Sequence, residues 1–215
     1  MGNNPTFREI DIYNNAIKNL KENNFQTYFR KLKPDKWVIS VFADASHNNL
    51  PPAGTGTGGG HVIFLGNGWT RAEDRTEETE TRKRCNILSW KCTKLSQACA
   101  STTEAETIAL ANALVEADVV KEIICEATLM DPSNIDIQAF CDNRNVVFNC
   151  KSTMMKDTVL PFRSYTKKIR DFLNSGRVFD VKEISGGEQV ADCLTKLRPG
   201  TVDIVDIIRK GQFFS

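Results

Sequence analysis

The order of strand-like and helix-like segments constrains the fold of this 215-residue chain more than any other feature. Three apolar segments, residues 36–46, 60–68 and 85–93, are rich in the β-branched and aromatic residues typical of strands. The first long helical pattern after these segments, over residues 102–126, follows the third of them. Because strands that follow one another without a crossover helix pair antiparallel, we expect the first three to form a meander.

The second half of the chain alternates strands and helices. The expected strands are residues 135–143 and 178–184, and the expected helices are residues 144–152, 159–176 and 186–197. A strand that follows a crossover helix pairs parallel to its neighbour. The fold class predicted is therefore α/β, with a mixed sheet and helices on both of its faces.

Composition excludes several classes of protein. An apolar content of 40% with 26% charged residues is typical of a globular chain. The longest apolar runs fall well short of the ~20 residues that a membrane span needs. The first residues lack the apolar stretch of a secretory signal, and the seven cysteines include no C-x-x-C pair. We therefore expect an intracellular protein with reduced thiols.

Four acidic residues stand where ligand sites form in such sheets. Asp44 ends the first expected strand, and Asp142 ends the fourth. Glu106 lies in the first turns of the long helix, and Asp192 lies in the last core helix. Any one of them alone would more often be a turn former or a cap. Together they would need cations, and two Mg²⁺ ions about 3.5–4 Å apart would neutralise them and activate a water for attack on a phosphate.

The long helix begins with two glutamates, and capping alone does not separate their roles. Ser101 followed three residues later by Glu104 makes one capping box, which leaves Glu106 free for a metal. Thr103 followed by Glu106 makes the other, which leaves Glu104 free. Both alternatives stay open at this level.

Four short stretches, "FADAS", "STTEAETIAL", "FCDN" and "EQVADCLTK", carry a resemblance. Together they resemble the ribonuclease H domain of retrotransposon polyproteins of the Ty1/copia type, over residues 38–196. The resemblance implies an RNase H-like sheet in the order 3-2-1-4-5. It also implies an endonuclease that cleaves the RNA strand of RNA–DNA hybrids with two Mg²⁺ ions, for which Mn²⁺ can substitute. The catalytic and metal-binding residues implied are Asp44, Glu106, Asp142 and Asp192.

The same resemblance implies the context of the domain. Residues 1–36 resemble the connection helix and linker that follow a reverse transcriptase, residues 37–198 form the RNase H-like domain, and residues 199–215 form a C-terminal helix and tail. The partner implied is a reverse transcriptase in the same polyprotein, and the place is the cytoplasm or a virus-like particle. The sequence departs from some members in having no histidine in the stretch directly before Asp192, "EISGGEQVAD", and in carrying a charged insertion at residues 70–84.

Substrate contacts are expected from two groups of residues. Polar side chains near the acids would read the 2′-hydroxyl groups that a hybrid displays in its wide minor groove: Ser46, Asn48, Thr103 and Asn143. Basic side chains of the helix at 159–176 would contact phosphates of the DNA strand: Arg163, Lys167, Lys168 and Arg170. Turn formation, capping and simple solvation are the structural alternatives for these residues.

Two other functions compete with the active nuclease. One is a non-catalytic RNase H-like module that binds nucleic acid or supports a reverse transcriptase, which the presence of all four acids disfavours. The other is an integrase-like nuclease, whose acids run Asp, Asp, Glu. In this chain the glutamate comes second, which argues against that family.

Overall fold

The structure, a computed structural model, describes residues 18, 29–32, 37–47, 56–68, 84–152, 160–196 and 204–213. Three predictions lie wholly or largely outside these residues. They are the N-terminal connection helix, the charged insertion at 70–84, and the substrate contact of Asn48.

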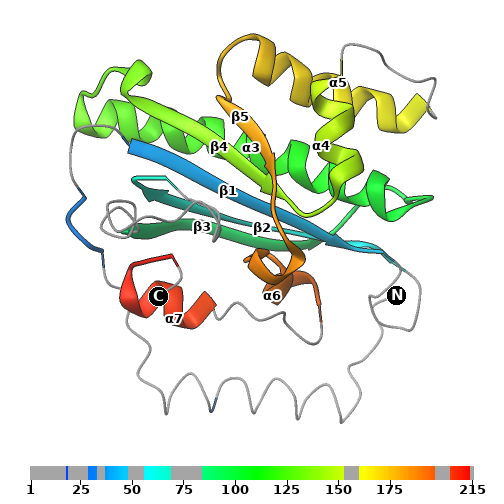
Figure 1. Ribbon diagram of the computed structural model, residues 1–215, viewed down its shortest axis with the longest axis horizontal. Coiled ribbons are helices and arrows are strands. Elements are labelled where there is room, and N and C mark those ends of the chain that lie inside the picture. Colours follow the sequence, from blue (N-terminus) through cyan, green and yellow to red (C-terminus); the bar gives the residue numbers. More distant parts are fainter. Residues whose placement is uncertain are drawn as a thin grey trace, which may run out of the picture.

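A five-stranded mixed sheet forms the centre of the molecule (Figure 1). Its strands are β1 (Trp37–Ser46), β2 (Gly58–Gly66), β3 (Cys85–Lys94), β4 (Ile135–Cys141) and β5 (Asp180–Glu183), in the order β3-β2-β1-β4-β5. The β1–β2 and β2–β3 pairs are antiparallel, whereas β1–β4 and β4–β5 are parallel. The predicted fold class and strand order are confirmed.

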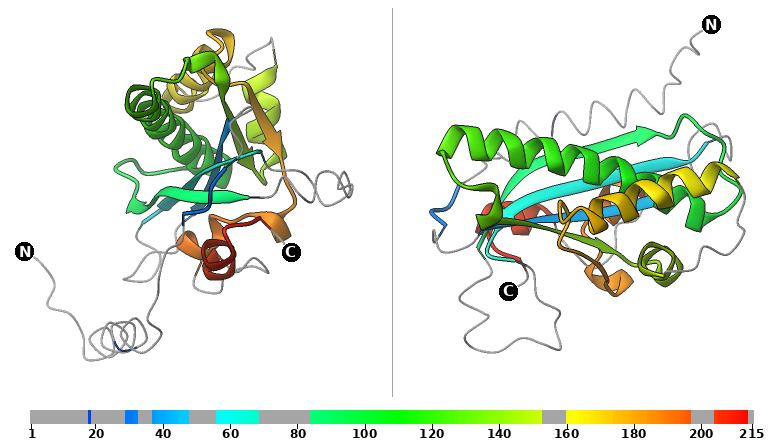
Figure 2. Two further views of the ribbon diagram at one scale, coloured as in Figure 1. Left: turned by 90° about the vertical axis from the view of Figure 1, so that its left-hand side faces the viewer. Right: turned by 90° about the horizontal axis from the view of Figure 1, so that it is seen from above.

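Helices cover both faces of the sheet, as Figures 1 and 2 show. One face carries α3 (Thr102–Thr128), α4 (Arg144–Lys151) and α5 (Leu160–Asn174). The other carries the short helices α6 (Asp192–Thr195) and α7 (Ile204–Lys210). A 3₁₀ turn, η2 (Pro132–Asn134), leads from α3 into β4. Gly176, at φ +72°, follows the end of α5, where the sequence predicted the stop.

The alternation of side chains along β1 builds a core on each face. Val41 packs into the cluster beneath α3, while the next residue, Phe42, packs into the cluster beneath α7. Phe42 stacks on Phe140 of β4 with ring centroids 4.9 Å apart. Phe213, just after α7, contacts the Phe42 ring as well and is 2% exposed, so this C-terminal segment is part of the packed body.

The prediction of one continuous last core helix over residues 186–197 is wrong. The structure has a 3₁₀ turn, η3 (Gly186–Glu188), a non-helical Gln189, and only then α6. Two consecutive glycines disfavour a continuous helix. Gln189 is 1% exposed, and its side-chain amide donates to the carbonyl of Ala43, which holds this position in an extended conformation.

Two expectations drawn from composition can be compared with the structure. Within the part of the chain that is described, no helix is both long and apolar enough to cross a membrane. All seven cysteines are free thiols. Burial raises the pKa of the Cys150 thiol to about 12 and that of Cys85 well above its usual range, so both are neutral packing residues.

A candidate metal centre of four carboxylates

Two of the four predicted acids meet because their strands are parallel neighbours. Phe42 of β1 pairs with Phe140 of β4, so Asp44 and Asp142 each lie two residues beyond a paired position at the same edge of the sheet. Asp44 is 1% exposed. Although β2, β3 and α3 separate them in the chain, positions 44 and 142 thus reach one site through the parallel pairing of β1 with β4.

Asp192 reaches Asp44 and Asp142 from the face of the sheet that carries α6 and α7. It opens α6, which follows the anchored Gln189. The side-chain amide of Gln189 donates to the carbonyl oxygen of Ala43 at 3.1 Å, one residue before Asp44, and its oxygen accepts from the amide of Ala191 at 3.2 Å. One carboxylate oxygen each from Asp44, Asp142 and Asp192 lies within 4.8 Å of the others.

The start of α3 distinguishes the two glutamates. Ser101 is the N-cap, and its hydroxyl oxygen accepts from the amide of Glu104 at 3.2 Å. The Glu104 carboxylate turns back and accepts from the amide of Ala100 at 2.7 Å, one residue before the N-cap. Glu104 therefore acts in the cap, and the helix begins as the Ser101 alternative requires.

Glu106 points to the carboxylates instead. Its carboxylate lies with the thiol of Cys141 and the carboxylate of Asp142, all within 4.8 Å. The Cys141 thiol is 3.7 Å from Oε2 of Glu106, and burial raises its pKa well above the usual range, so it stays protonated and donates. The hard oxygen atoms of the acids are then the available ligands, as Mg²⁺ prefers.

The electrostatics of the site favour a bound cation. Burial first, and then the Asp142 and Asp44 carboxylates, raise the pKa of Glu106 to about 7. Burial also raises the pKa of Asp44 to about 6, although the Thr195 hydroxyl and the Lys196 ammonium act against the shift. Oδ1 of Asp142 is buried and has no hydrogen-bond partner among the described residues. Buried acids that repel one another, one with an unused oxygen, are a donor set that fits a divalent metal.

Two further side chains at this site were not predicted from the sequence. Thr195 donates its hydroxyl to Oδ2 of Asp44. Nζ of Lys196 lies 2.6 Å from Oδ1 of Asp192 and 3.9 Å from Oδ2 of Asp44. Their spacing from Asp192, three and four residues in "ADCLTK", is the signal that could have found them, because such neighbours share a helix face.

The residues predicted to contact 2′-hydroxyl groups of a substrate differ in their surroundings in the structure. Asn48 lies outside the described residues. Ser46 is buried at the end of β1, and its hydroxyl has no hydrogen-bond partner within the described part of the chain. Asn143 caps α4 by accepting from the amide of Asn145 at 2.9 Å, and its Nδ2 donates to Oγ1 of Thr103 at 3.2 Å. Thr103 and Asn143 thus form a polar pair that also has a structural role.

The basic residues of α5 are split between solvent and protein contacts. Arg163 and Lys167 are exposed. Arg170 is half-buried, and Nε and Nη2 of its guanidinium donate to the carbonyl of Asn149 at 3.0 and 2.6 Å. Lys168 faces a pocket between the sheet and the helices. Three of the four cations are thus exposed on α5, and the fourth, Arg170, is engaged with the backbone of Asn149.

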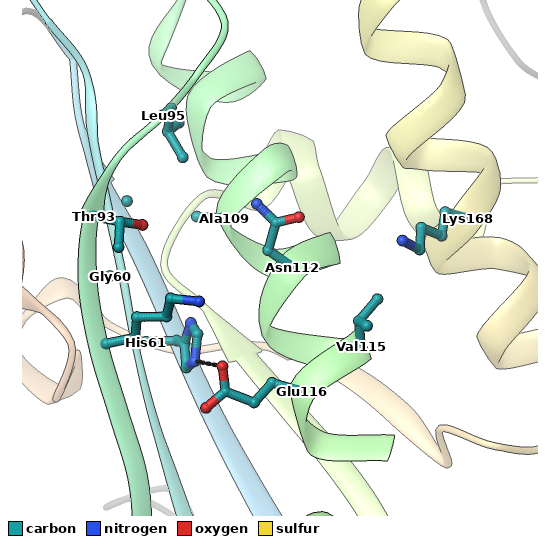
Figure 3. Close-up of a pocket in the computed structure, with 11 residues that line it drawn as sticks. Gly60, His61, Thr93, Leu95, Ala109, Asn112, Val115, Glu116 and Lys168 are labelled. Carbon is teal, nitrogen blue, oxygen red and sulfur yellow. Dashed lines mark ion pairs between the residues drawn. The ribbon is translucent and has the colours of Figure 1, made fainter. Parts of the chain in front are cut away.

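This pocket, of about 400 Å³, is lined by residues of β2, β3, α3 and α5 (Figure 3). His61 lies in it with Nε2 3.1 Å from Oε2 of Glu116, and Ser89 donates to the other carboxylate oxygen. Burial lowers the pKa of His61 despite the nearby Glu116 carboxylate. The imidazole of His61 and the partly exposed carboxylate of Glu116 thus face each other in a pocket that none of the four acids lines.

No protein-family model matches the sequence, and no curated protein matches it. Solved RNase H structures do align with it. The N-terminal RNase H domain of Rv2228c from Mycobacterium tuberculosis, solved as a fusion with maltose-binding protein, is 15% identical at a TM-score of 0.45, covering 80% of this chain and 96% of that one. LC11-RNase H1 in complex with an RNA/DNA hybrid is 16% identical at a TM-score of 0.43, covering 76% and 96%.

A retroviral enzyme aligns in the same way. The foamy viral protease-reverse transcriptase in complex with an RNA/DNA hybrid is 15% identical at a TM-score of 0.49, and the alignment covers 82% of this chain but only 22% of that one. The structural neighbours are thus RNase H domains, free-standing or fused to a reverse transcriptase. The likeness concerns the fold.

Proposed function

We propose that this chain is a ribonuclease H that cleaves the RNA strand of RNA–DNA hybrids. The observation that carries the proposal is the convergence of one carboxylate oxygen each from Asp44, Asp142 and Asp192 within 4.8 Å, together with Glu106, whose carboxylate lies within the same distance of Asp142. These acids come from two parallel strands and from helices on opposite faces of the sheet. The motifs around them favour the Ty1/copia type of retrotransposon polyprotein.

The four carboxylates would hold two Mg²⁺ ions, and Mn²⁺ could replace them. The chemistry these ions supply when bound is activation of a water and stabilisation of the leaving oxygen in an in-line displacement. The chain itself supplies the placement. Thr195 orients the carboxylate of Asp44 through its hydroxyl, and Gln189 ties the segment that carries Asp192 to the strand that carries Asp44.

Substrate recognition would use groups next to the acids. Thr103 and Asn143 lie at the starts of α3 and α4, close to Glu106, where they could read 2′-hydroxyl groups. Ser46, the last residue of β1, and Asn48, two residues further along the chain, would do the same. Contacts with DNA phosphates would come from three α5 residues, namely Arg163, Lys167 and Lys168. Arg170 would act mainly by joining α5 to α4.

The cellular setting proposed follows from the family resemblance. The domain would act beside a reverse transcriptase in the same polyprotein, in the cytoplasm or in a virus-like particle, on the hybrids that reverse transcription produces. A second candidate is a non-catalytic RNase H-like module that only binds nucleic acid. It would need no cluster of four acids, and this observation favours the nuclease.

The test is a cleavage assay on a hybrid with 5′-labelled RNA. Purified protein is incubated with Mg²⁺, with Mn²⁺ or with EDTA, and the Asp142→Asn variant from the same preparation controls for contaminating nucleases. We expect metal-dependent cleavage that leaves 5′-phosphate and 3′-hydroxyl ends, and little cleavage of duplex DNA. Intact RNA with both metals, from protein that melts cooperatively, would favour the non-catalytic module.

A further inference from the structure

Lys196 brings an ammonium group to the carboxylate cluster. The helix α6 is one turn long, so Lys196 lies one turn after Asp192 on the same face. Nζ lies 2.6 Å from Oδ1 of Asp192 and 3.9 Å from Oδ2 of Asp44. Among the described residues, Lys196 is the only cation that forms an ion pair with either of these acids.

The Lys196 side chain has room to swing away from the two carboxylates into solvent. It is 39% exposed, whereas the side chains of Asp192 and Asp44 are 8% and 2% exposed. A lysine is a flexible chain that keeps its charge in water when its head group moves outward. The two acids, by contrast, are fixed without it, because Thr195 donates to Asp44 and Gln189 anchors the segment before Asp192.

We propose that Lys196 is a built-in counter-cation of the metal-free site, which a divalent metal must displace. The ammonium lies 2.6 Å from Oδ1 of Asp192 and 3.9 Å from Oδ2 of Asp44, two of the carboxylates that a metal would use, and a divalent cation bound there would repel it strongly. Lys196 is thus a positioning residue that lowers the affinity for Mg²⁺ and sets the concentration at which the site loads. This role rests on the proposed metal centre.

The matched pair of variants is Lys196→Met and Lys210→Met. Lys210 forms the same i,i+4 ion pair at the end of a short helix, with Nζ 2.8 Å from Oδ2 of Asp206, and its side chain is 46% exposed. It lies in α7, and its ion pair with Asp206 involves none of the four acids. Mg²⁺ affinity is measured by calorimetric titration without nucleic acid, and Mn²⁺ affinity by electron paramagnetic resonance.

We expect Lys196→Met to bind Mg²⁺ about five-fold more tightly than the wild type, since an ion pair of this partly exposed kind is lost on loading. The Lys210→Met variant should bind like the wild type, and Lys196→Arg, which keeps the charge, should not bind more tightly. In EDTA the melting temperature of Lys196→Met should fall, and saturating Mg²⁺ should raise it by more than it raises that of the wild type.

The outcomes separate this inference from the proposed function. If the wild type binds Mg²⁺ and Lys196→Met binds it equally or more weakly, then Lys196 does not compete, and the counter-cation role is wrong while the metal centre stands. If the wild type binds neither metal, the metal centre itself fails and the role of Lys196 fails with it. Cleavage is not needed for either decision.

Discussion

Replacing Glu106 by glutamine should make the metal-free protein more stable at alkaline pH and should abolish cleavage. Glu106 is surrounded by other acids: its carboxylate lies within 4.8 Å of a carboxylate oxygen of Asp142, and Asp44 adds to the repulsion. Glutamine has nearly the same shape but carries no charge. It therefore removes the repulsion and, with it, the ligand that a metal would use.

The magnitude follows from the pKa of Glu106. Burial first, then the Asp142 and Asp44 carboxylates, raise it from 4.5 to about 7. An acid that holds its proton more tightly when folded contributes full stability below pH 4.5, and the protein loses that stability as the pH rises through about 7. The full change corresponds to about 3 kcal/mol, and the partial exposure of the side chain reduces our expectation to about 1–2 kcal/mol.

The assay is thermal unfolding in EDTA across the pH range. At pH 8.5 the Glu106→Gln variant should melt about 2–8 °C above the wild type, given about 2–4 °C per kcal/mol for a chain of this size. At pH 4.5 the two should melt together, because the wild-type carboxyl group is then protonated. With Mg²⁺ the order should reverse, since the wild type keeps all four carboxylates, binds the metal more tightly than the variant and is stabilised more by it.

Two outcomes would refute the argument from charge repulsion, and a third would refute the role as a metal ligand. If Glu106→Gln is no more stable than the wild type at pH 8.5 in EDTA, or if the difference does not change with pH, then Glu106 is not held among like charges. Cleavage by the variant at the wild-type rate would in turn show that Glu106 is not a metal ligand.

Three further predictions concern neighbouring residues. Asp142→Asn should still bind a hybrid in an anisotropy assay but cleave it at least about 100-fold more slowly, since a charged ligand is lost; wild-type cleavage would contradict this. Glu104→Gln should keep most activity and lose under about 1 kcal/mol in a urea melt, because glutamine can still accept from the amide of Ala100. Gln189→Ala should cost about 1–3 kcal/mol, because the carbonyl of Ala43 is left buried without this donor; a neutral result would mean that Gln189 is not an anchor.

The sequence by itself determined the elements and much of their local detail. The strand and helix patterns predicted the five strands and α3 because burial on one or both faces leaves a periodic record in neighbouring residues. The cap at Ser101 could also be foreseen, as one of two registers, because its hydrogen bonds join residues at most four positions apart. The order of the acids along the chain was also visible, because that order can be read without knowing any distance between them.

Only the tertiary structure decided how the acids meet and what surrounds them. Parallel pairing of β1 with β4 places Asp44 beside Asp142, and the raised pKa of Glu106 exists only once burial and these neighbours act together. Gln189 binds a carbonyl 146 positions earlier, and Thr195 binds Asp44 across 151 positions. Contacts of that range leave no periodic pattern in the sequence, so the anchor at Gln189 and the meeting of Thr195 with Asp44 could be found only in the folded chain.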